Sequence, residues 1–242
     1  MDLNFEHILF IDVETVPQYA SYADVPEAMK KLWEKKSAYF RTEEQRPEDV
    51  YERAGIWAEF GRIICLSAGF IYRHNGQPTL RLKSFAGHNE KALLQGFCRM
   101  LAAFIAKKKN VRLCAHNGKE FDFPYIARRL LINSLPLPEA LDVAGRKPWE
   151  TLFLDTMELW KFGDYKHFCS LELLTTVLNI DTPKDDIDGS QVASVYYIDG
   201  DLPRIIRYCE KDVLAVAQLL LRYRGQALLD KVESVTGTNA QI

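Results

Sequence analysis

Short apolar runs alternate along the chain with polar turns and with longer segments whose apolar residues recur at helical spacing. Runs of strand length occupy residues 7–13, 61–73, 79–85, 111–115 and 151–154. Runs of this length between polar turns predict strands. Asn75-Gly76 separates the second run from the third. Because Asn and Gly tolerate the positive φ angles of a tight turn, this pair predicts a β-hairpin.

Apolar residues at helical spacing predict helices over 90–109, about 121–132 and 202–223, and the chain is mostly helical in pattern from residue 170 onward. The order is strand, hairpin, helix, strand, helix, strand and then helices. It predicts an α/β fold in which a mixed β-sheet is flanked by α-helices. No repeat, low-complexity tract or interdomain linker divides the chain, so residues 1–242 are expected to form one domain.

The segment 18–54 differs from its surroundings because it is rich in charged and aromatic residues. Pro26 and Pro47 are placed as helix starts, since the fixed φ of proline suits the first turn of a helix. We expect an inserted pair of helices lying over the sheet. It is either a lid or a plain surface insertion, and long connections are only sometimes functional, which favours the second.

The composition of the chain indicates which kinds of ligand and surroundings it suits. Charged residues make up 26% of the chain and the formal net charge is −2. A protein that coats long duplexes is usually more basic, whereas one that grips a few terminal nucleotides need not be. Five cysteines are scattered without CxxC spacing, which argues against a disulfide framework or a zinc site and fits a reducing cytoplasm. No apolar run is long enough to span a bilayer, so no membrane partner is expected.

Four acidic residues stand out by their positions in this pattern. Asp12 and Glu14 lie at the end of the first predicted strand, and alternate residues of a strand point to one face. Asp122 follows a strand and opens a helix, where an acid is also a common partner of the helix dipole. Tyr208 and Asp212, four residues apart, share a helix face, an arrangement that taken alone is more often a surface pair.

Carboxylates brought together repel one another and are costly to keep ionised unless cations neutralise them. Oxygen ligands without His or Cys select Mg²⁺ or Mn²⁺ over zinc. Two such ions are the usual means of in-line attack on a phosphodiester. The pattern therefore predicts a metal-dependent nuclease with Asp12, Glu14, Asp122 and Asp212 as ligands.

Three motifs carry a resemblance to a known family. They are Ile11-Asp12-Val13-Glu14-Thr15, Phe121-Asp122-Phe123-Pro124-Tyr125 and Tyr208-Cys209-Glu210-Lys211-Asp212. In order and detail they resemble the Exo I, Exo II and Exo III motifs of the DEDD 3′–5′ exonucleases. The likeness is greatest to the proofreading exonuclease domain of family B DNA polymerases and extends over about residues 7–223. It implies a ribonuclease H-like fold.

The resemblance also implies a branch and a domain arrangement. One branch of the family has a His five positions before the last aspartate, where this chain has Arg207. Tyr208 instead places the chain with the tyrosine branch. The chain ends too soon to hold a polymerase palm domain, so a stand-alone exonuclease is expected.

By the same resemblance, Asp12 bridges two metal ions, Glu14 and Asp212 complete the first, and Asp122 holds the second through water. Tyr208 orients the attacking water, because a phenol with a pKa near 10 is a poor base at neutral pH. The expected substrate is the 3′ end of single-stranded DNA, which is cut to 5′-mononucleotides. RNA or short oligonucleotides remain an alternative substrate, and a non-catalytic module that grips 3′ ends is a less favoured alternative.

Four further residues are candidate contacts with the nucleic acid: Thr15, Asn117, Phe121 and Lys184. Thr15 would present its backbone to the terminal nucleotide. Asn117 is a backbone contact or simply part of an Asn-Gly turn. Phe121 stacks on a base or packs in the core, with packing favoured. Lys184 meets a phosphate or sits in a polar loop. The sequence does not specify a protein partner.

Overall fold

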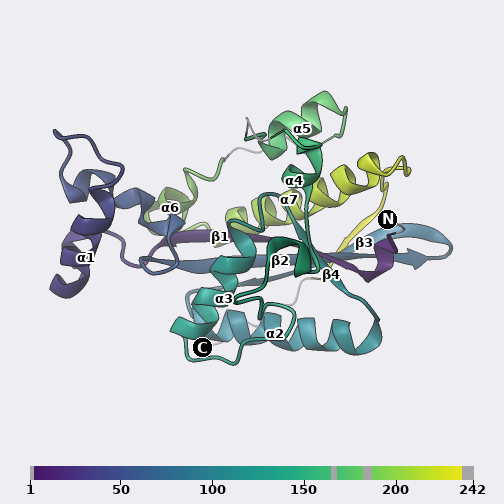
Figure 1. Cartoon of the computed structure of the whole chain (residues 1–242), viewed down its shortest axis with the longest axis horizontal. Coiled ribbons are helices and arrows are strands. Elements are labelled where there is room, and N and C mark those ends of the chain that lie inside the picture. The colour runs from purple at the N-terminus through teal and green to yellow at the C-terminus, as the bar shows by residue number, and fades with distance from the viewer. Residues whose placement is uncertain (1–2, 165–167, 182–186, 236–242) are drawn as a thin grey trace.

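A mixed sheet with strand order β5-β4-β1-β2-β3-β6 runs through the centre of the molecule (Figure 1). The computed structural model describes residues 3–164, 168–181 and 187–235. Within these residues β1 pairs antiparallel with β2 and parallel with β4, and β2 and β3 form a long hairpin. The strands are β1 (Ile8–Pro17), β2 (Gly61–His74), β3 (Gln77–Ala86), β4 (Arg112–Ala115), β5 (Phe153–Asp155) and β6 (Val232–Ser234).

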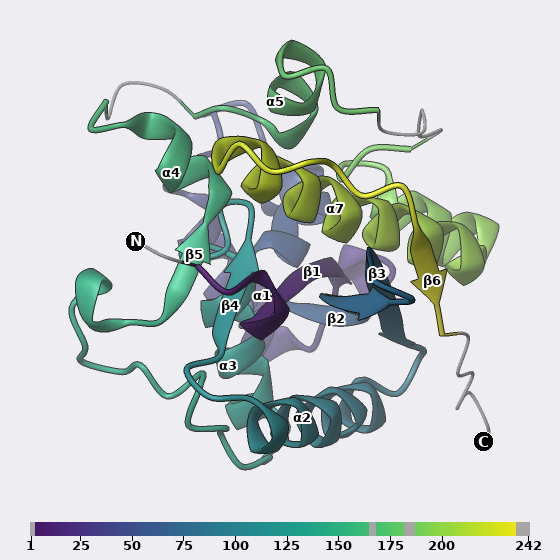
Figure 2. The same ribbon diagram turned by 90° about the vertical axis from the view of Figure 1, so that its right-hand side faces the viewer.

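Helices cover both faces of this sheet. Figure 2 shows α7 along one face and α2 with α3 along the other. The α-helices are α1 (Glu27–Ser37), α2 (Glu90–Lys107), α3 (Asp122–Ile132), α4 (Thr156–Lys161), α5 (Leu171–Val177), α6 (Val192–Ser194) and α7 (Leu202–Tyr223). The 3₁₀-helical segments are η1 (Phe5–His7), η2 (Tyr22–Asp24), η3 (Pro47–Ile56) and η4 (Pro148–Glu150), and η5 (Val195–Asp199) is a π-helical turn. The predicted α/β fold, a mixed sheet flanked by helices, is confirmed.

The two faces of β1 contact different cores, as the alternation of side chains along a strand requires. Leu9 and Ile11 belong to a buried apolar cluster with residues of α2 and α3. Ile8 and Phe10 belong to a second cluster, formed with α7. Because even-numbered residues of β1 face α7, the same alternation directs the residue at position 12 toward that helix.

The hairpin is formed as predicted, whereas the first strand is longer than its predicted range. Asn75 and Gly76 have φ angles of 50° and 81°, so the predicted tight turn is confirmed. β1, however, continues to Pro17. Asp12 and Glu14 therefore lie inside the strand rather than at its end. The strand is longer than its apolar run because pairing with β2 continues past the two acids.

The segment after β1 forms its own small core. Trp33 of α1 is fully buried among aromatic residues, with ring centroids 5.7 Å from Tyr51 and 5.2 Å from Phe60. Pro26 precedes α1, and Pro47 is the first residue of η3. Both prolines therefore stand at helix starts, as predicted.

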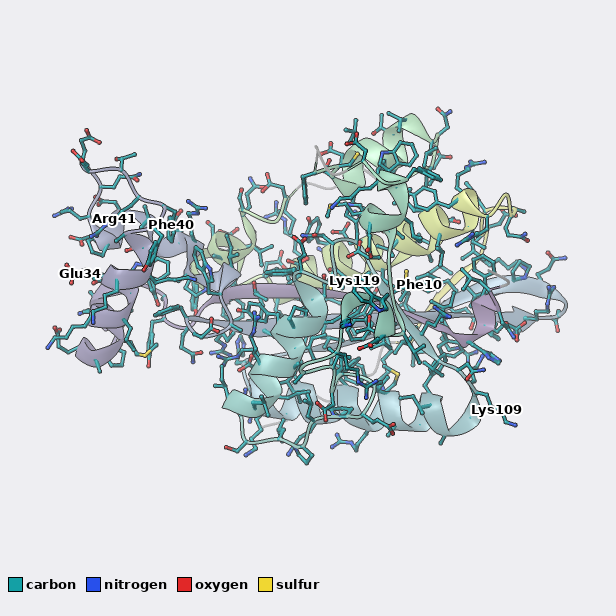
Figure 3. All side chains as sticks on the ribbon, viewed as in Figure 1. Phe10, Glu34, Phe40, Arg41, Lys109 and Lys119 are labelled. Atoms are coloured by element: carbon teal, nitrogen blue, oxygen red, sulfur yellow. The ribbon has the colours of Figure 1, made fainter. Side chains whose placement is uncertain are left out.

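The position of α1 differs from the expectation that these helices lie over the sheet. α1 lies beyond the ends of β1 and β2 (Figure 1). In Figure 3 Phe40 and Arg41 of this segment lie at one end of the long axis, Lys119 near the middle and Lys109 at the other end. The physical reason is the aromatic core described above, which buries the apolar faces of these turns against one another.

A buried ion pair ties α3 to α2. The Arg129 guanidinium donates from Nε to Oε1 of Glu90 at 2.9 Å and from Nη2 to Oε2 at 2.5 Å. Arg129 Nη1 also donates to the carbonyl of Ala58 at 2.8 Å, and Glu90 Oε1 accepts from the N–H of Ile63 at 2.7 Å. The side chains are 5% and 7% exposed, so neither charge can be left unpaired cheaply. None of the helices in the described ranges is long and apolar enough to cross a membrane.

Replacing Arg129 by Met is expected to lower the free energy of unfolding by about 3–5 kcal/mol, because the buried Glu90 carboxylate loses its partner. The double variant Arg129→Met with Glu90→Gln should lose less, since a neutral amide still accepts from Ile63. Urea unfolding followed by circular dichroism measures both. A double variant that is less stable than the single one would contradict this account.

Candidate active site

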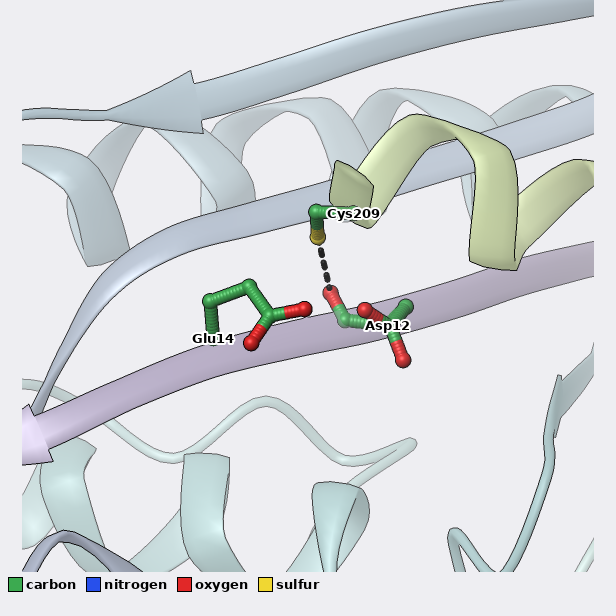
Figure 4. Close-up of side chains that lie close together, drawn as sticks. All are labelled: Asp12, Glu14 and Cys209. Carbon is green, nitrogen blue, oxygen red and sulfur yellow. Dashed lines mark hydrogen bonds between the residues drawn. The ribbon is translucent and has the colours of Figure 1, made fainter. Parts of the chain in front are cut away.

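Two of the four predicted acids lie side by side on β1, facing α7. Donor atoms of Asp12, Glu14 and Cys209 all lie within 4.8 Å of one another (Figure 4). The thiol of Cys209 donates to the backbone carbonyl of Asp12 at 3.4 Å. This contact fixes α7 against β1 at the two acids. A register shift in the β1–β2 pairing falls between Glu14 and Thr15, so the strand is irregular at the same point.

Helix α7 carries the whole of the third motif. Its buried side includes Ile205, Cys209 and Val213, which recur at helical spacing and hold the helix on the sheet. Tyr208 is partly buried and packs against the apolar cluster that contains Cys209. Asp212 lies one turn after Tyr208 and acts electrostatically on Glu14. The two polar residues of the motif therefore flank the cysteine that touches β1.

Asp122 reaches the site through a gap in the sheet. β4 pairs with β1 only between Ile8 and Phe10, so in the described part of the chain no strand pairs with the following residues of β1 on that side. α3 begins at Asp122, and the carboxyl group of Asp122 forms a hydrogen bond with the backbone of Val13. Asp122 is 3% exposed. The early end of β4 thus lets a helix terminus approach the centre of β1.

The four carboxyl groups interact electrostatically. Burial, and next the charge of Asp122, raise the pKa of Asp12 from 3.8 to about 7. Burial, and next the charge of Asp12 and then that of Asp212, raise the pKa of Glu14 well above its ordinary value. Burial, followed by the charges of Asp155 and Asp212, raises the pKa of Asp122 to about 7. The site therefore resists full ionisation in the absence of a positive charge.

The donor set fits divalent cations. Oδ2 of Asp12 is buried and has no hydrogen-bond partner among the residues that the structure describes. A buried carboxylate oxygen without a donor is costly unless a cation takes that place. The surrounding ligands are carboxylate oxygens, which suit Mg²⁺ and Mn²⁺, with one thiol beside them. Asp12, Glu14, Asp122 and Asp212 are the residues that could hold such ions.

Comparison with known proteins shows the family of the chain. Residues 57–237 match a family described as a predicted 3′–5′ exonuclease related to the exonuclease domain of PolB. The chain belongs to this family. It is accordingly a nuclease, a hydrolase that acts on nucleic acid, as the motifs predicted. The matched residues include Asp122, Tyr208 and Asp212, whereas Asp12 and Glu14 precede them.

A solved structure shares the fold. The family B DNA polymerase from the hyperthermophilic archaeon Pyrobaculum calidifontis is similar over 88% of this chain and 24% of its own, with a TM-score of 0.51 and 15% sequence identity. This chain thus spans about a quarter of the length of that polymerase. The likeness confirms the predicted ribonuclease H-like fold. No protein of curated function matches the chain.

Thr15, one of the four predicted contacts with nucleic acid, uses its side chain within the fold. The hydroxyl of Thr15 donates to the carbonyl of Gly55 at 2.8 Å, and the hydroxyl of Tyr125 donates to the same oxygen at 2.8 Å. Thr15 therefore joins β1 to η3 through its side chain. Whether its backbone contacts a terminal nucleotide stays a prediction.

The other three contacts also stay predictions. Asn117 has a φ of 59°, and its Oδ1 is buried without a partner among the described residues. The ring of Phe121 lies 5.3 Å from that of Tyr125 and is half-buried against the core, which fits the packing role. Lys184 lies outside the residues that the structure describes.

Sequence reasoning missed Asp155, which is 2% exposed and acts electrostatically on Asp122. It is the last residue of β5 and the N-cap of α4. A detectable signal was present, because an Asp between a short apolar run and a helical segment is a typical N-cap. Cys209 was also missed as a neighbour of the two β1 acids.

The raised pKa values predict how stability depends on pH in the absence of metal. Asp12 and Asp122 keep their protons to about pH 7 in the fold, whereas in the unfolded chain they lose them near pH 4. Their contribution to stability is thus present below pH 4 and is lost as the pH rises to 7. Asp12→Asn should therefore gain melting temperature over the wild type on going from pH 5 to pH 8 in chelator.

Thermal unfolding by circular dichroism measures this difference, with exposed Glu43→Gln as the matched control. Addition of Mg²⁺ should restore the melting temperature of the wild type at pH 8. An equal difference between Asp12→Asn and the wild type at both pH values would count against the charge repulsion described here.

Proposed function

We propose that this chain is a divalent-metal-dependent exonuclease that shortens single-stranded DNA from its 3′ end and releases 5′-mononucleotides. One observation carries the proposal: acids from β1, α3 and α7, two of them buried and two half-buried, form one mutually repelling group around the unpartnered Oδ2 of Asp12. Membership of the 3′–5′ exonuclease family supports the direction of the reaction. Residues 1–242 are taken as one catalytic domain.

Two Mg²⁺ or Mn²⁺ ions are the proposed cofactors. When bound, such a pair activates the attacking water and neutralises charge on the leaving 3′ oxygen. Asp12 would contact both ions, Glu14 and Asp212 the first, and Asp122 the second through water. The burial of Glu14 and Asp122 supports the assignment, because electrostatic attraction to a cation is stronger where water is excluded.

Tyr208 would orient the attacking water by a hydrogen bond from its phenol. Phenols hold their proton at neutral pH, since their ordinary pKa is about 10, so a role as general base is not proposed. The position of Tyr208 one turn before Asp212, against the apolar cluster around Cys209, supports this assignment. We accordingly assign the chain to the tyrosine branch of these exonucleases.

DNA is the proposed substrate in preference to RNA. The likeness to a DNA polymerase supports this choice. A net charge of −2 supports grip on a short single-stranded end rather than on a long duplex. Thr15, Asn117, Phe121 and Lys184 are proposed to contact the terminal nucleotides. All five cysteines are free, which supports the cytoplasm as the compartment.

Asp12→Ala is expected to lower the rate of mononucleotide release by about 10³-fold or more, because the ligand shared by both ions is lost and metal-ion catalysis supplies several kcal/mol. The assay is release of mononucleotides from a single-stranded DNA labelled at its 3′ end, with Mg²⁺, Mn²⁺ and chelator arms. Asp142→Ala, an exposed aspartate, is the matched control and should keep the wild-type rate. Wild-type rates for Asp12→Ala would refute the proposal.

Tyr208→Phe should lower kcat by about 10²-fold with little change in KM, since the phenol acts on the water and not on substrate binding. Single-stranded DNA and RNA of the same sequence are digested in parallel with both proteins. Faster digestion of RNA by the wild type would replace the DNA assignment with an exoribonuclease. Tight binding of 3′ ends with no release of mononucleotides would support a binding module instead.

A further inference from the structure

Asp155 holds four backbone amides with one buried carboxylate. Its Oδ1 accepts from the N–H groups of Asn117, Met157 and Glu158 at 3.0, 2.9 and 3.2 Å. Its Oδ2 accepts from the N–H of Lys119 at 3.0 Å. Two of these amides begin α4, and the other two belong to the turn that follows β4. One side chain therefore joins a helix terminus to a turn far away in the sequence.

The turn after β4 is tight and needs such support. Asn117 adopts a φ of 59°, in the left-handed region that few residues with a side chain occupy. A Cβ at Gly118 would collide with the Cβ of Ala115. Strained backbone of this kind persists only where the surrounding structure determines it. Asp155 supplies two hydrogen bonds to this turn, on either side of Gly118.

A second contact joins the same two segments. Nδ1 of His116 and the hydroxyl of Thr156 are 2.9 Å apart, and Nε2 of His116 lies 2.9 Å from the carbonyl of Cys169. The residues before and within the turn are thus fastened to the residues at the start of α4. Within the residues that the structure describes, Asp155 is the member of this group that accepts hydrogen bonds from backbone on both sides of Gly118.

The turn determines where Asp122 lies. The N–H of Phe121 donates to the carbonyl of Asn117 at 3.0 Å, and the N–H of Phe123 donates to the carbonyl of Gly118 at 3.0 Å. The first turn of α3 is therefore built on residues that Asp155 holds. A change in the turn would move the carboxylate of Asp122 relative to β1.

We propose that Asp155 is a positioning residue for the metal centre: its carboxylate fixes the turn 117–119 and so sets the place at which Asp122 meets a cation. Asp155 is not itself a ligand, because its oxygens face four N–H groups. The inference rests on the proposed function. Loss of a residue that orients a metal ligand commonly lowers metal affinity by about 10–100-fold.

The variant Asp155→Ser tests the hydrogen bonds to the turn separately from the cap of α4. Serine is a good N-cap, so α4 keeps its cap, but one hydroxyl cannot accept from both Asn117 and Lys119. Asp155→Asn is the milder second variant, since it keeps one carbonyl oxygen and loses one acceptor. Ser170→Ala is the control: Ser170 caps α5 by accepting from the N–H of Leu173, and that helix carries none of the four acids.

Mn²⁺ titration by calorimetry is the primary measurement, with circular dichroism to establish that each variant is folded. The wild type and Ser170→Ala should bind two ions alike. Asp155→Ser should bind the weaker ion at least about 10-fold less tightly. Its kcat should fall at an unchanged KM for DNA, and Asp155→Asn should change in the same direction.

The outcomes separate the two ideas. If the wild type binds two ions and both Asp155 variants bind them with wild-type affinity, the positioning role is overturned while the proposed function stands. If Asp155→Ser does not fold, Asp155→Asn decides the question by the same titration. If the wild type binds no Mn²⁺, the metal-dependent function itself fails, and this inference fails with it.

Discussion

Like charges that lie close together and away from water repel one another strongly, and this protein gathers four carboxyl groups where β1, α3 and α7 meet. Repulsion alone would move these groups apart. Contacts elsewhere in the fold hold the elements that carry them in place. β1 is paired with β2 past the acids and with β4 before them, α7 is fastened to it at Cys209, and α3 is anchored by the Arg129–Glu90 pair. The rigidity of these elements gives a cation a fixed place to bind.

Much of this scaffold could be predicted from local pattern. Apolar runs and helical spacing located the hairpin and α7, because both depend on residues close together in the sequence. β6 (232–234) was missed because it is three residues long, largely exposed, and formed by parallel pairing with β3. The place of α1 was missed because its aromatic residues pack among themselves, which the spacing of those residues does not reveal.

In the candidate site, too, the features that depend on neighbouring residues could be predicted and those that depend on distant contacts could not. Asp12 and Glu14 could be paired from their alternation along a strand, and Asp212 with Tyr208 from a turn of helix. That α3 approaches the middle of β1 could not be inferred, since it depends on how many residues of β4 pair. Asp155 was missed because its role lies in contacts with Asn117 and Lys119, 36 to 38 residues away. Family similarity alone leaves Asp12 and Glu14 aside, since the match begins at residue 57.

The separation of the acids along the chain has a consequence for how the protein is made. Asp212 lies 200 residues after Asp12 and 13 residues after the end of η5. Contacts between such distant segments form late, because the intervening chain must first be ordered. A nascent chain therefore carries only part of the acidic group until α7 docks. Chemistry that needs all four acids is therefore expected only after α7, which follows β1 and α3 in the chain, has docked.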